Sequence, residues 1–323
     1  MGGLRVVIPG GSGQVGRLLA GYLQERGHHV TVLTRAPFTA PWQTVHWDGL
    51  TLGPWVETLE GADVCIHLSG KSVNCRATAR NRRALRDSRI GPTLLLHRAF
   101  AELKTPPRVW MNASTATIYR HSLDKPMDES GEIGGSELIG ARRRATKKWN
   151  WTIQLAKDWE AAFFGTPTPG TRKLALRTSL VFSPAAGNVF TVLSRMARIG
   201  LGGTQGNGRQ MVSWMHEADF ARAVEFLMEH EEMDGPVNLA APHPLPNKEF
   251  MAELREAWEM PNGIWAPAAV IAAASFFLRT EPELVLKSRY VVPGKLLAAG
   301  FEFEFPSWAE AAADLVRRER ARD

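Results

Sequence analysis

The sequence has 323 residues, of which 44% are hydrophobic, so it is long enough for one large domain or two of medium size. Its 39 basic and 33 acidic residues leave a net charge of +6, which suits an anionic ligand but is weak support for nucleic-acid binding. Cys65 and Cys75 form no CxxC pair and no zinc-like spacing with histidine. We therefore expect reduced thiols, no metal site and a cytoplasmic protein.

Short β-branched runs alternate with helix-like stretches over the first two-thirds of the chain. The predicted strands are 4–8, 29–33, 43–47, 63–68, 108–113, 173–182 and 236–240, and the predicted helices include 15–26, 79–103, 151–164 and 217–230. This alternation indicates an α/β fold, in which helices cover both faces of a doubly wound parallel sheet of about seven strands. Several strands are apolar throughout, as expected of strands buried on both faces.

The segment RVVIPGGSGQVGRLLAGYL (5–23) passes from a strand through clustered glycines into an amphipathic helix. Glycine leaves backbone amides open to a diphosphate, and the start of the helix adds partial positive charge. The segment therefore predicts a dinucleotide site; the alternative is a glycine-rich turn that binds nothing. The residues expected to bind are Gly10, Gly11, Ser12, Gly13, Gln14, Val15 and Gly16.

The strand predicted at 29–33 leads to Thr34 and Arg35, where an NAD site usually carries an acidic residue. An acidic side chain would repel a 2′-phosphate, whereas a guanidinium can pair with one. These two residues therefore favour NADP(H) over NAD(H), unless Arg35 is a solvated loop residue.

Small and polar residues follow two later strands. Leu68, Ser69 and Gly70 lie where a dinucleotide would cross the sheet edge. Ser114 and Thr115 end the next strand, where their hydroxyls could bind a substrate carbonyl or simply cap a loop.

The composition changes after residue 182, because 183–210 is rich in glycine and 241–300 holds helices separated by prolines. We expect a dinucleotide-binding Rossmann domain of residues 1–182 and 211–240, a smaller, mostly helical substrate lobe of residues 183–210 and 241–307, and a C-terminal helix of residues 308–323. A substrate would lie between the lobes, at the carboxyl ends of the strands.

The most apolar stretch, 264–278, contains Pro267 and is shorter than the roughly 20 residues that a membrane span requires. We expect it to be a helix packed on another domain, and we expect no membrane partner.

These motifs resemble those of the extended short-chain dehydrogenase/reductase superfamily, of the epimerase/dehydratase type. The similar segments are GGSGQVG (10–16), HLSG (67–70), the Ser/Thr cluster before Tyr119, LRTSLVFSP (176–184) and GRQMVSWMHEADFARAV (208–224). Further segments are similar to an epimerase-family branch with a C-terminal domain of unknown function, namely RDSRI (86–90), KDWEAA (157–162), GPVNLAAPHPLPNKEF (235–250) and VVPGKLLAAGFEFEFPS (291–307).

The resemblance implies an NADP-binding doubly wound fold with a small substrate lobe. It places Leu180 and Val181 near the cofactor, and Arg209 and Gln210 near a substrate. Substrates of the branch are largely unassigned, and some members carry an old label as cell-division inhibitors.

The superfamily's usual proton donor, the tyrosine of a YxxxK pair, is missing, because none of the three tyrosines has lysine four residues later. Aligned on Trp159 and Glu160, the tyrosine position falls at Thr152 and the lysine position at Ala156. Lys157 is one residue away, which turns its side chain by about 100° on a helix. Loss of a general acid costs roughly 10²- to 10⁴-fold in rate. Hydride transfer belongs to the cofactor, so reduction of a quinone or flavin would need no tyrosine.

Three residues remain as candidates for proton handling. Thr115 aligns with the superfamily's catalytic Ser/Thr and is expected to position a substrate oxygen, with Ser114 as the alternative if the register shifts by one. Tyr119 either handles a proton or is a buried ring with one hydrogen bond.

The segment ARRRATKK (141–148) places five cations in eight residues. It is either a guide for an anionic substrate, or a regulatory contact, or a solvated surface loop.

The sequence thus predicts an NADP(H)-binding oxidoreductase or epimerase-like protein with an unidentified small substrate, for which an anionic molecule is one option. The alternative is a cofactor-bound regulatory or interaction protein with little or no catalysis. We expect no nucleic-acid partner, and the oligomeric state stays open.

Overall fold

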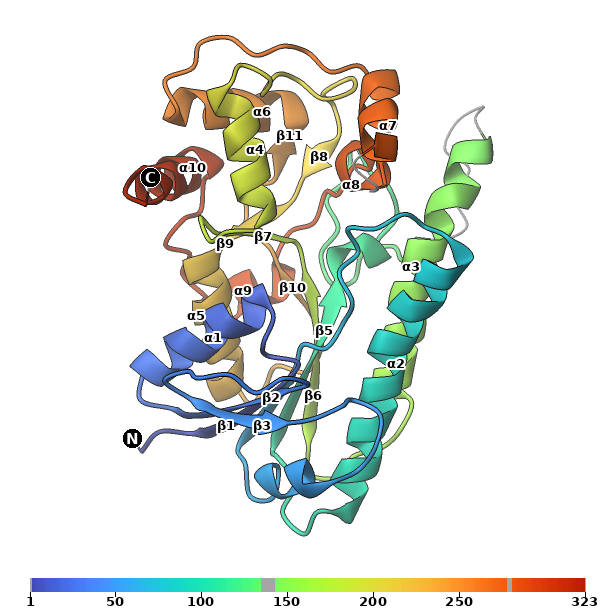
Figure 1. Ribbon diagram of the computed structural model, residues 1–323, viewed down its shortest axis with the longest axis vertical. Coiled ribbons are helices and arrows are strands. Elements are labelled where there is room, and N and C mark those ends of the chain that lie inside the picture. The colour runs from blue at the N-terminus through green and yellow to red at the C-terminus, as the bar shows by residue number, and fades with distance from the viewer. Residues whose placement is uncertain (1, 135–142, 278–280, 323) are drawn as a thin grey trace.

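The computed structural model describes residues 2–134, 143–277 and 281–322, and its centre is a sheet of seven parallel strands (Figure 1). The strands are β1 (Arg5–Pro9), β2 (His29–Thr34), β3 (Gln43–His46), β4 (Val64–His67), β5 (Val109–Thr115), β6 (Arg172–Thr178) and β10 (Gly235–Leu239). Their order across the sheet is β10-β6-β5-β4-β1-β2-β3. This order confirms the predicted doubly wound α/β fold.

Helices cover both faces of the sheet, with α1 (Gln14–Glu25) and α5 (Glu217–Glu229) on one face and α2 (Ala79–Glu102) and α3 (Arg143–Phe164) on the other (Figure 1). A 3-10 helix, η1 (Pro54–Thr58), packs on the second face together with α2 and α3. Because side chains alternate along a strand, Ile8 packs in the core under α1 and Val7 in the core under α2. Both faces are therefore buried, as the continuous apolar strands predicted.

Helix α3 begins at Arg143, earlier than the predicted start at residue 151. Residues 143–148 of the basic segment are consequently helical, so the prediction of a surface loop is wrong for them. Residues 141 and 142 lie outside the described residues.

The stretch 173–182, predicted as one strand, divides at Ser179. The Ser179 N–H and hydroxyl both donate to the carbonyl of Leu239, at 3.0 and 2.9 Å. The chain then leaves the main sheet, and β7 (Leu180–Phe182) pairs with β9 (Trp214–His216). The break falls at this serine, and the apolar pattern of the strand does not reveal it.

The smaller lobe has a core of its own, beyond the carboxyl ends of the sheet strands (Figure 1). Its elements are β7, β9, α4 (Val189–Arg198), α6 (Asn247–Ala257), α10 (Trp308–Arg320) and the short pair β8 (Met211–Val212) and β11 (Leu245–Pro246). Trp308 stacks on Phe250 at 4.2 Å between ring centroids and lies 5.1 Å from Trp214. The C-terminal helix, predicted at residues 308–323, shares this core.

Three further short helices are α7 (Ala268–Phe277), α8 (Glu283–Leu286) and α9 (Gly294–Ala298). Only Ile271 and Ser275 of α7 are buried. The prediction of a helix in 264–278 is confirmed, but the prediction that it packs against another domain is wrong for most of its surface. In the described ranges, no helix has both the length and the apolar character needed to cross a membrane.

Candidate cofactor and substrate site

The glycine loop lies where the strand order reverses, because the chain runs from β1 through β2 to β3 on one side and then crosses to β4 on the other. In open α/β sheets the ligand crevice lies at such a point, beyond the carboxyl ends of the strands. Leu68, Ser69 and Gly70 follow β4; the Leu68 N–H donates to Pro9 O at 2.8 Å, and Ser69 lies against Gly10. The structure thus brings the glycine loop together with the predicted cofactor residues after β4.

Two positions in the loop require glycine because backbone atoms pack closely around them. Gly10 has a φ of +79°, and a Cβ there would lie 2.6 Å from the backbone nitrogen of Ser69. A Cβ on Gly16 would lie 2.5 Å from Gly11 Cα. Neither position tolerates a side chain, so these glycines let α1 and the loop after β4 approach the end of β1.

Gly13 is different, because a Cβ there would meet no atom within 4 Å. Its φ of −70° and ψ of 171° are open to any residue, and no side chain caps α1 at this end. The first N–H groups of α1 therefore point outward at the positive end of the helix. The fold therefore does not require glycine at position 13. A diphosphate bound at this end of the helix would require it, because a side chain would fill the space that the diphosphate occupies.

Two cations lie near the end of β2, one in the loop that follows it and one on α1. Arg35 is exposed, and Thr34 is buried and accepts a hydrogen bond from the Ala36 N–H at 3.4 Å. Arg17 of α1 donates to Ser12 O at 2.8 Å, and its guanidinium lies 4.2 Å from the ring centroid of Phe38 in the loop after β2. Sequence reasoning missed Arg17, since only the folded chain brings it next to that loop.

Gln14 connects the glycine loop to the smaller lobe. Its Nε2 donates to Ala185 O at 3.3 Å, and its Oε1 accepts from Asn188 Nδ2 at 3.3 Å. Asn188 Nδ2 also donates to Val181 O at 3.0 Å. Val181 lies in the core of the sheet domain, and Leu180 packs against the core of the smaller lobe. The chain after β7 is thereby held against the start of α1, through an asparagine that no motif indicated.

Thr115 differs from the other two candidates for proton handling, because it is partly exposed at the carboxyl end of β5. Its hydroxyl accepts from the Thr117 N–H at 3.1 Å and caps the short turn η2 (Ala116–Ile118). Ser114 is buried and donates to Glu160 Oε1 at 2.6 Å. Tyr119 is only 2% exposed.

Tyr119 belongs to a buried polar network. Its hydroxyl donates to Asn238 Oδ1 at 2.8 Å and accepts from Arg177 Nη1 at 2.8 Å. Arg177 also donates from Nε and Nη2 to the two oxygens of Glu160, at 2.9 and 2.8 Å. Burial raises the pKa of Tyr119 to about 12, so its proton stays in place at neutral pH. The structure therefore supports the buried-ring alternative for Tyr119 rather than a role in proton transfer.

The α3 residues at the positions of the YxxxK pair make other contacts. Thr152 donates to Glu283 Oε1 of α8 at 2.7 Å, and burial raises the pKa of the Glu283 carboxyl. Ala156 is buried in a small apolar cluster, and Lys157 is exposed to solvent. Lys157 thus does not take the place of the missing lysine.

The two predicted substrate contacts, Arg209 and Gln210, differ in their exposure to solvent. Arg209 is exposed, whereas Gln210 is buried and its Nε2 donates to Gln205 O at 2.7 Å. Gln210 therefore stabilises its own turn, which argues against a role in substrate binding. Arg209 stays a candidate.

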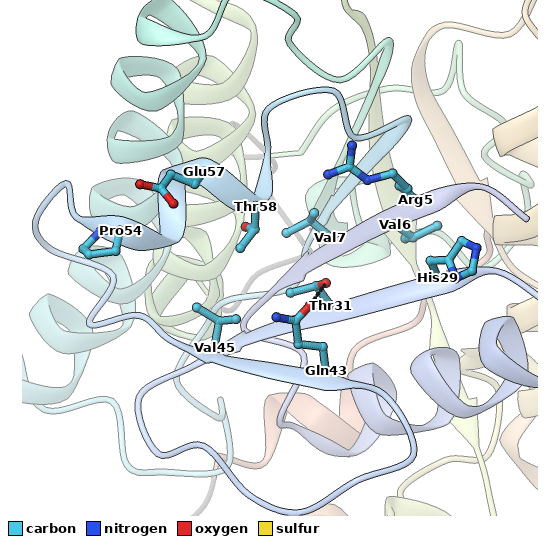
Figure 2. A pocket seen from close by; sticks show the side chains of 10 residues that line it. All are labelled: Arg5, Val6, Val7, His29, Thr31, Gln43, Val45, Pro54, Glu57 and Thr58. Carbon is cyan, nitrogen blue, oxygen red and sulfur yellow. Dashed lines mark hydrogen bonds between the residues drawn. The ribbon is translucent and has the colours of Figure 1, made fainter.

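A pocket of about 440 Å³ lies elsewhere, between η1 and the face of β1, β2 and β3 (Figure 2). Arg5 and His29, which line this pocket, are the first residues of β1 and β2. Because the glycine loop follows the last residue of β1, this pocket is at the opposite end of the strands and is separate from the candidate site.

Comparison with known proteins gives matches over nearly the whole chain. Residues 6–240 match the NAD dependent epimerase/dehydratase family, and residues 266–315 match a domain of unknown function, DUF1731. An epimerase family protein of Mycobacterium leprae is 32% identical over 97% of this chain and 96% of its own length.

Two solved structures are similar as well. The human epimerase family protein SDR39U1 (isoform 2), crystallised with NADPH, is 27% identical with a TM-score of 0.84, over 97% of this chain and 99% of that chain. A nucleoside-diphosphate sugar epimerase from Corynebacterium glutamicum is 26% identical with a TM-score of 0.75, over 97% of this chain and 58% of that chain.

Proposed function

Because the chain belongs to the NAD dependent epimerase/dehydratase family, we propose that it is an NADP(H)-dependent oxidoreductase acting on a small substrate. The observation that carries this proposal is the uncapped start of α1 at Gly13, at the switch point of the sheet. The similarity to a human protein solved with NADPH supports the choice of cofactor. A cytoplasmic location is part of the proposal, since Cys65 and Cys75 are both free.

In this proposal the first N–H groups of α1 bind the diphosphate, and Arg35 binds the 2′-phosphate with Arg17 beside it. When bound, the nicotinamide supplies or accepts a hydride. Thr115 at the end of β5 holds a substrate oxygen, and the exposed Arg209 would favour an anionic substrate.

Replacing Arg35 by alanine tests the cofactor assignment. A charge-assisted hydrogen bond is worth about 1.5–3 kcal/mol, so we expect the NADPH dissociation constant to rise roughly 10- to 100-fold, while NADH binding changes little. Calorimetric titration with both cofactors measures this. The control is Arg98→Ala, which removes another exposed arginine near the far end of α2. If wild type binds NADH as tightly as NADPH and Arg35→Ala binds both as wild type does, the NADP assignment is wrong.

Replacing Thr115 by valine tests the substrate assignment. Loss of one hydrogen-bond donor at a reacting oxygen lowers kcat by about 10²-fold, and Thr115→Ser should restore most of it. Tyr119→Phe serves as the comparison, because it should reduce stability through the buried network but leave turnover in place. Normal turnover of an identified substrate by Thr115→Val would rule out this role.

A cofactor-bound regulatory protein is the second candidate, and it is favoured by Thr152 and Ala156 at the tyrosine and lysine positions. The two candidates differ in turnover. Protein loaded with NADPH would be tested with carbonyl compounds, quinones and flavins while nicotinamide absorbance is followed. Oxidation above background supports the enzyme, and no oxidation across the panel favours the regulatory protein.

A further inference from the structure

Helix α7 presents apolar side chains to solvent. Residues 264–277 include no charged residue, and Phe277 is 80% exposed, Phe276 61% and Val270 55%. Single exposed apolar residues are common, but several on one helix indicate a contact surface.

A basic segment lies against this helix. Residues 71–86 hold six cations and no acidic residue, and Arg80, Arg82 and Arg83 at the start of α2 are exposed. The guanidinium of Arg82 lies 5.1 Å from the Trp151 ring of α3. The neighbouring helix α3 contains four more cations in its first six residues, 143–148.

Three contacts join the basic segment to α7 and to the chain that follows it. Arg76 Nη2 donates to Phe276 O at 2.6 Å, and the guanidinium of Arg76 lies 4.2 Å from the centroid of the Phe276 ring. In addition, the Ala77 N–H donates to Glu281 Oε1 at 2.7 Å. Figure 1 shows α7 on the same side of the molecule as the first turns of α2 and α3. We call this combined area the α7 surface: Val270, Phe276 and Phe277 with Arg80, Arg82 and Arg83.

We propose that the α7 surface binds membranes that contain anionic lipids. Aromatic side chains partition into the boundary between head groups and acyl chains, and nearby arginines pair with lipid phosphates. The chain would lie on the membrane without spanning it. The expectation of no membrane partner rests on Pro267 and on the length of segment 264–278, which argue against a span but not against attachment to the surface.

Charge favours a membrane over a second copy of the chain. In a symmetric dimer the same patch meets itself, so the arginines of both copies would face one another in a partly desolvated interface. An anionic membrane meets the same arginines with opposite charge, and it also accepts the phenylalanine rings, which a nucleic-acid backbone does not.

Vesicle co-sedimentation tests the proposal with the full-length protein. We expect binding to vesicles of phosphatidylcholine with 30% phosphatidylglycerol at least on the order of a hundredfold stronger than to phosphatidylcholine alone, since three arginines contribute about fivefold each, and weaker binding at high salt. Arg80→Ala with Arg83→Ala should weaken binding about thirtyfold, since each cation near an anionic surface contributes about fivefold. Phe276→Ser with Phe277→Ser should weaken it at least about tenfold.

Matched variants control for charge and for apolar area. Arg98→Ala with Lys104→Ala removes two exposed cations at the other end of α2, and Leu50→Ser removes a side chain that is 74% exposed on the loop before η1. Both controls should bind vesicles as wild type does. All variants change exposed residues, and unchanged urea unfolding curves would verify that they fold.

Three outcomes would overturn the proposal. The first is the absence of vesicle binding, and the second is binding that the controls reduce as much as the α7 variants do. The third is a dimer in sedimentation velocity that Phe276→Ser with Phe277→Ser dissociates while vesicles remain unbound, which would assign the α7 surface to a second copy.

Discussion

Valine in place of Gly13 is expected to raise the NADPH dissociation constant at least about a hundredfold, while the free energy of unfolding changes by no more than about 1 kcal/mol. A Cβ at this position meets no atom of the protein within 4 Å, and the backbone angles are open to any residue, so we expect the fold to accept valine. It occupies the place of the diphosphate, however, and covers the first N–H groups of α1. Loss of two charge-assisted hydrogen bonds accounts for the expected decrease in affinity.

The matched control is Gly91→Val in α2, where a Cβ also meets no atom within 4 Å. This variant should bind NADPH as wild type does. Calorimetry gives the dissociation constants, and urea unfolding gives the stabilities. Wild-type affinity in Gly13→Val would show that α1 does not bind a diphosphate, and the proposed function would then lose its main support.

Alanine in place of Glu160 has the largest expected effect on stability, a loss of about 3–5 kcal/mol. The substitution leaves the Arg177 guanidinium buried without its carboxylate, and it removes the acceptor of the Ser114 hydroxyl. Because small domains are stable by only about 5–15 kcal/mol, much of the protein would unfold at moderate urea concentrations.

Glu231→Ala is the comparison for Glu160→Ala. Glu231 accepts a hydrogen bond from Arg108 at 2.9 Å, but its side chain is 78% exposed, so its loss should cost less than about 1 kcal/mol. Chemical denaturation of both variants measures the difference. Equal losses would mean that the buried network contributes no more than a surface ion pair.

Local sequence patterns were sufficient to predict the parallel sheet and the helices that cover it. Runs of apolar residues marked its strands, and the glycine spacing placed the loop after β1. Gly10 and Gly16 are glycines because backbone atoms come within 3 Å of where a Cβ would lie, a constraint that recurs wherever a helix packs closely on a strand end.

Contacts between distant segments could not be predicted from those patterns. Thr152 bonds with Glu283, which is 131 positions away, and Gln14 bonds with Asn188, which is 174 positions away. The exposure of α7 was also missed, since an apolar sequence does not reveal which neighbours will cover it. For Tyr119 the sequence left proton handling and a buried ring as alternatives, and only the folded chain places its hydroxyl between Asn238 and Arg177.

The smaller lobe has a consequence for synthesis of the chain on the ribosome. Its core joins β7 and β9 to α6 and finally to α10, whose Trp308 stacks on Phe250. Because translation runs from the N-terminus, this core stays incomplete until α10 has left the exit tunnel. A chain that stops before Trp308 would retain every strand of the main sheet and yet expose the aromatic rings that α10 covers, so it would be prone to aggregate and to be degraded.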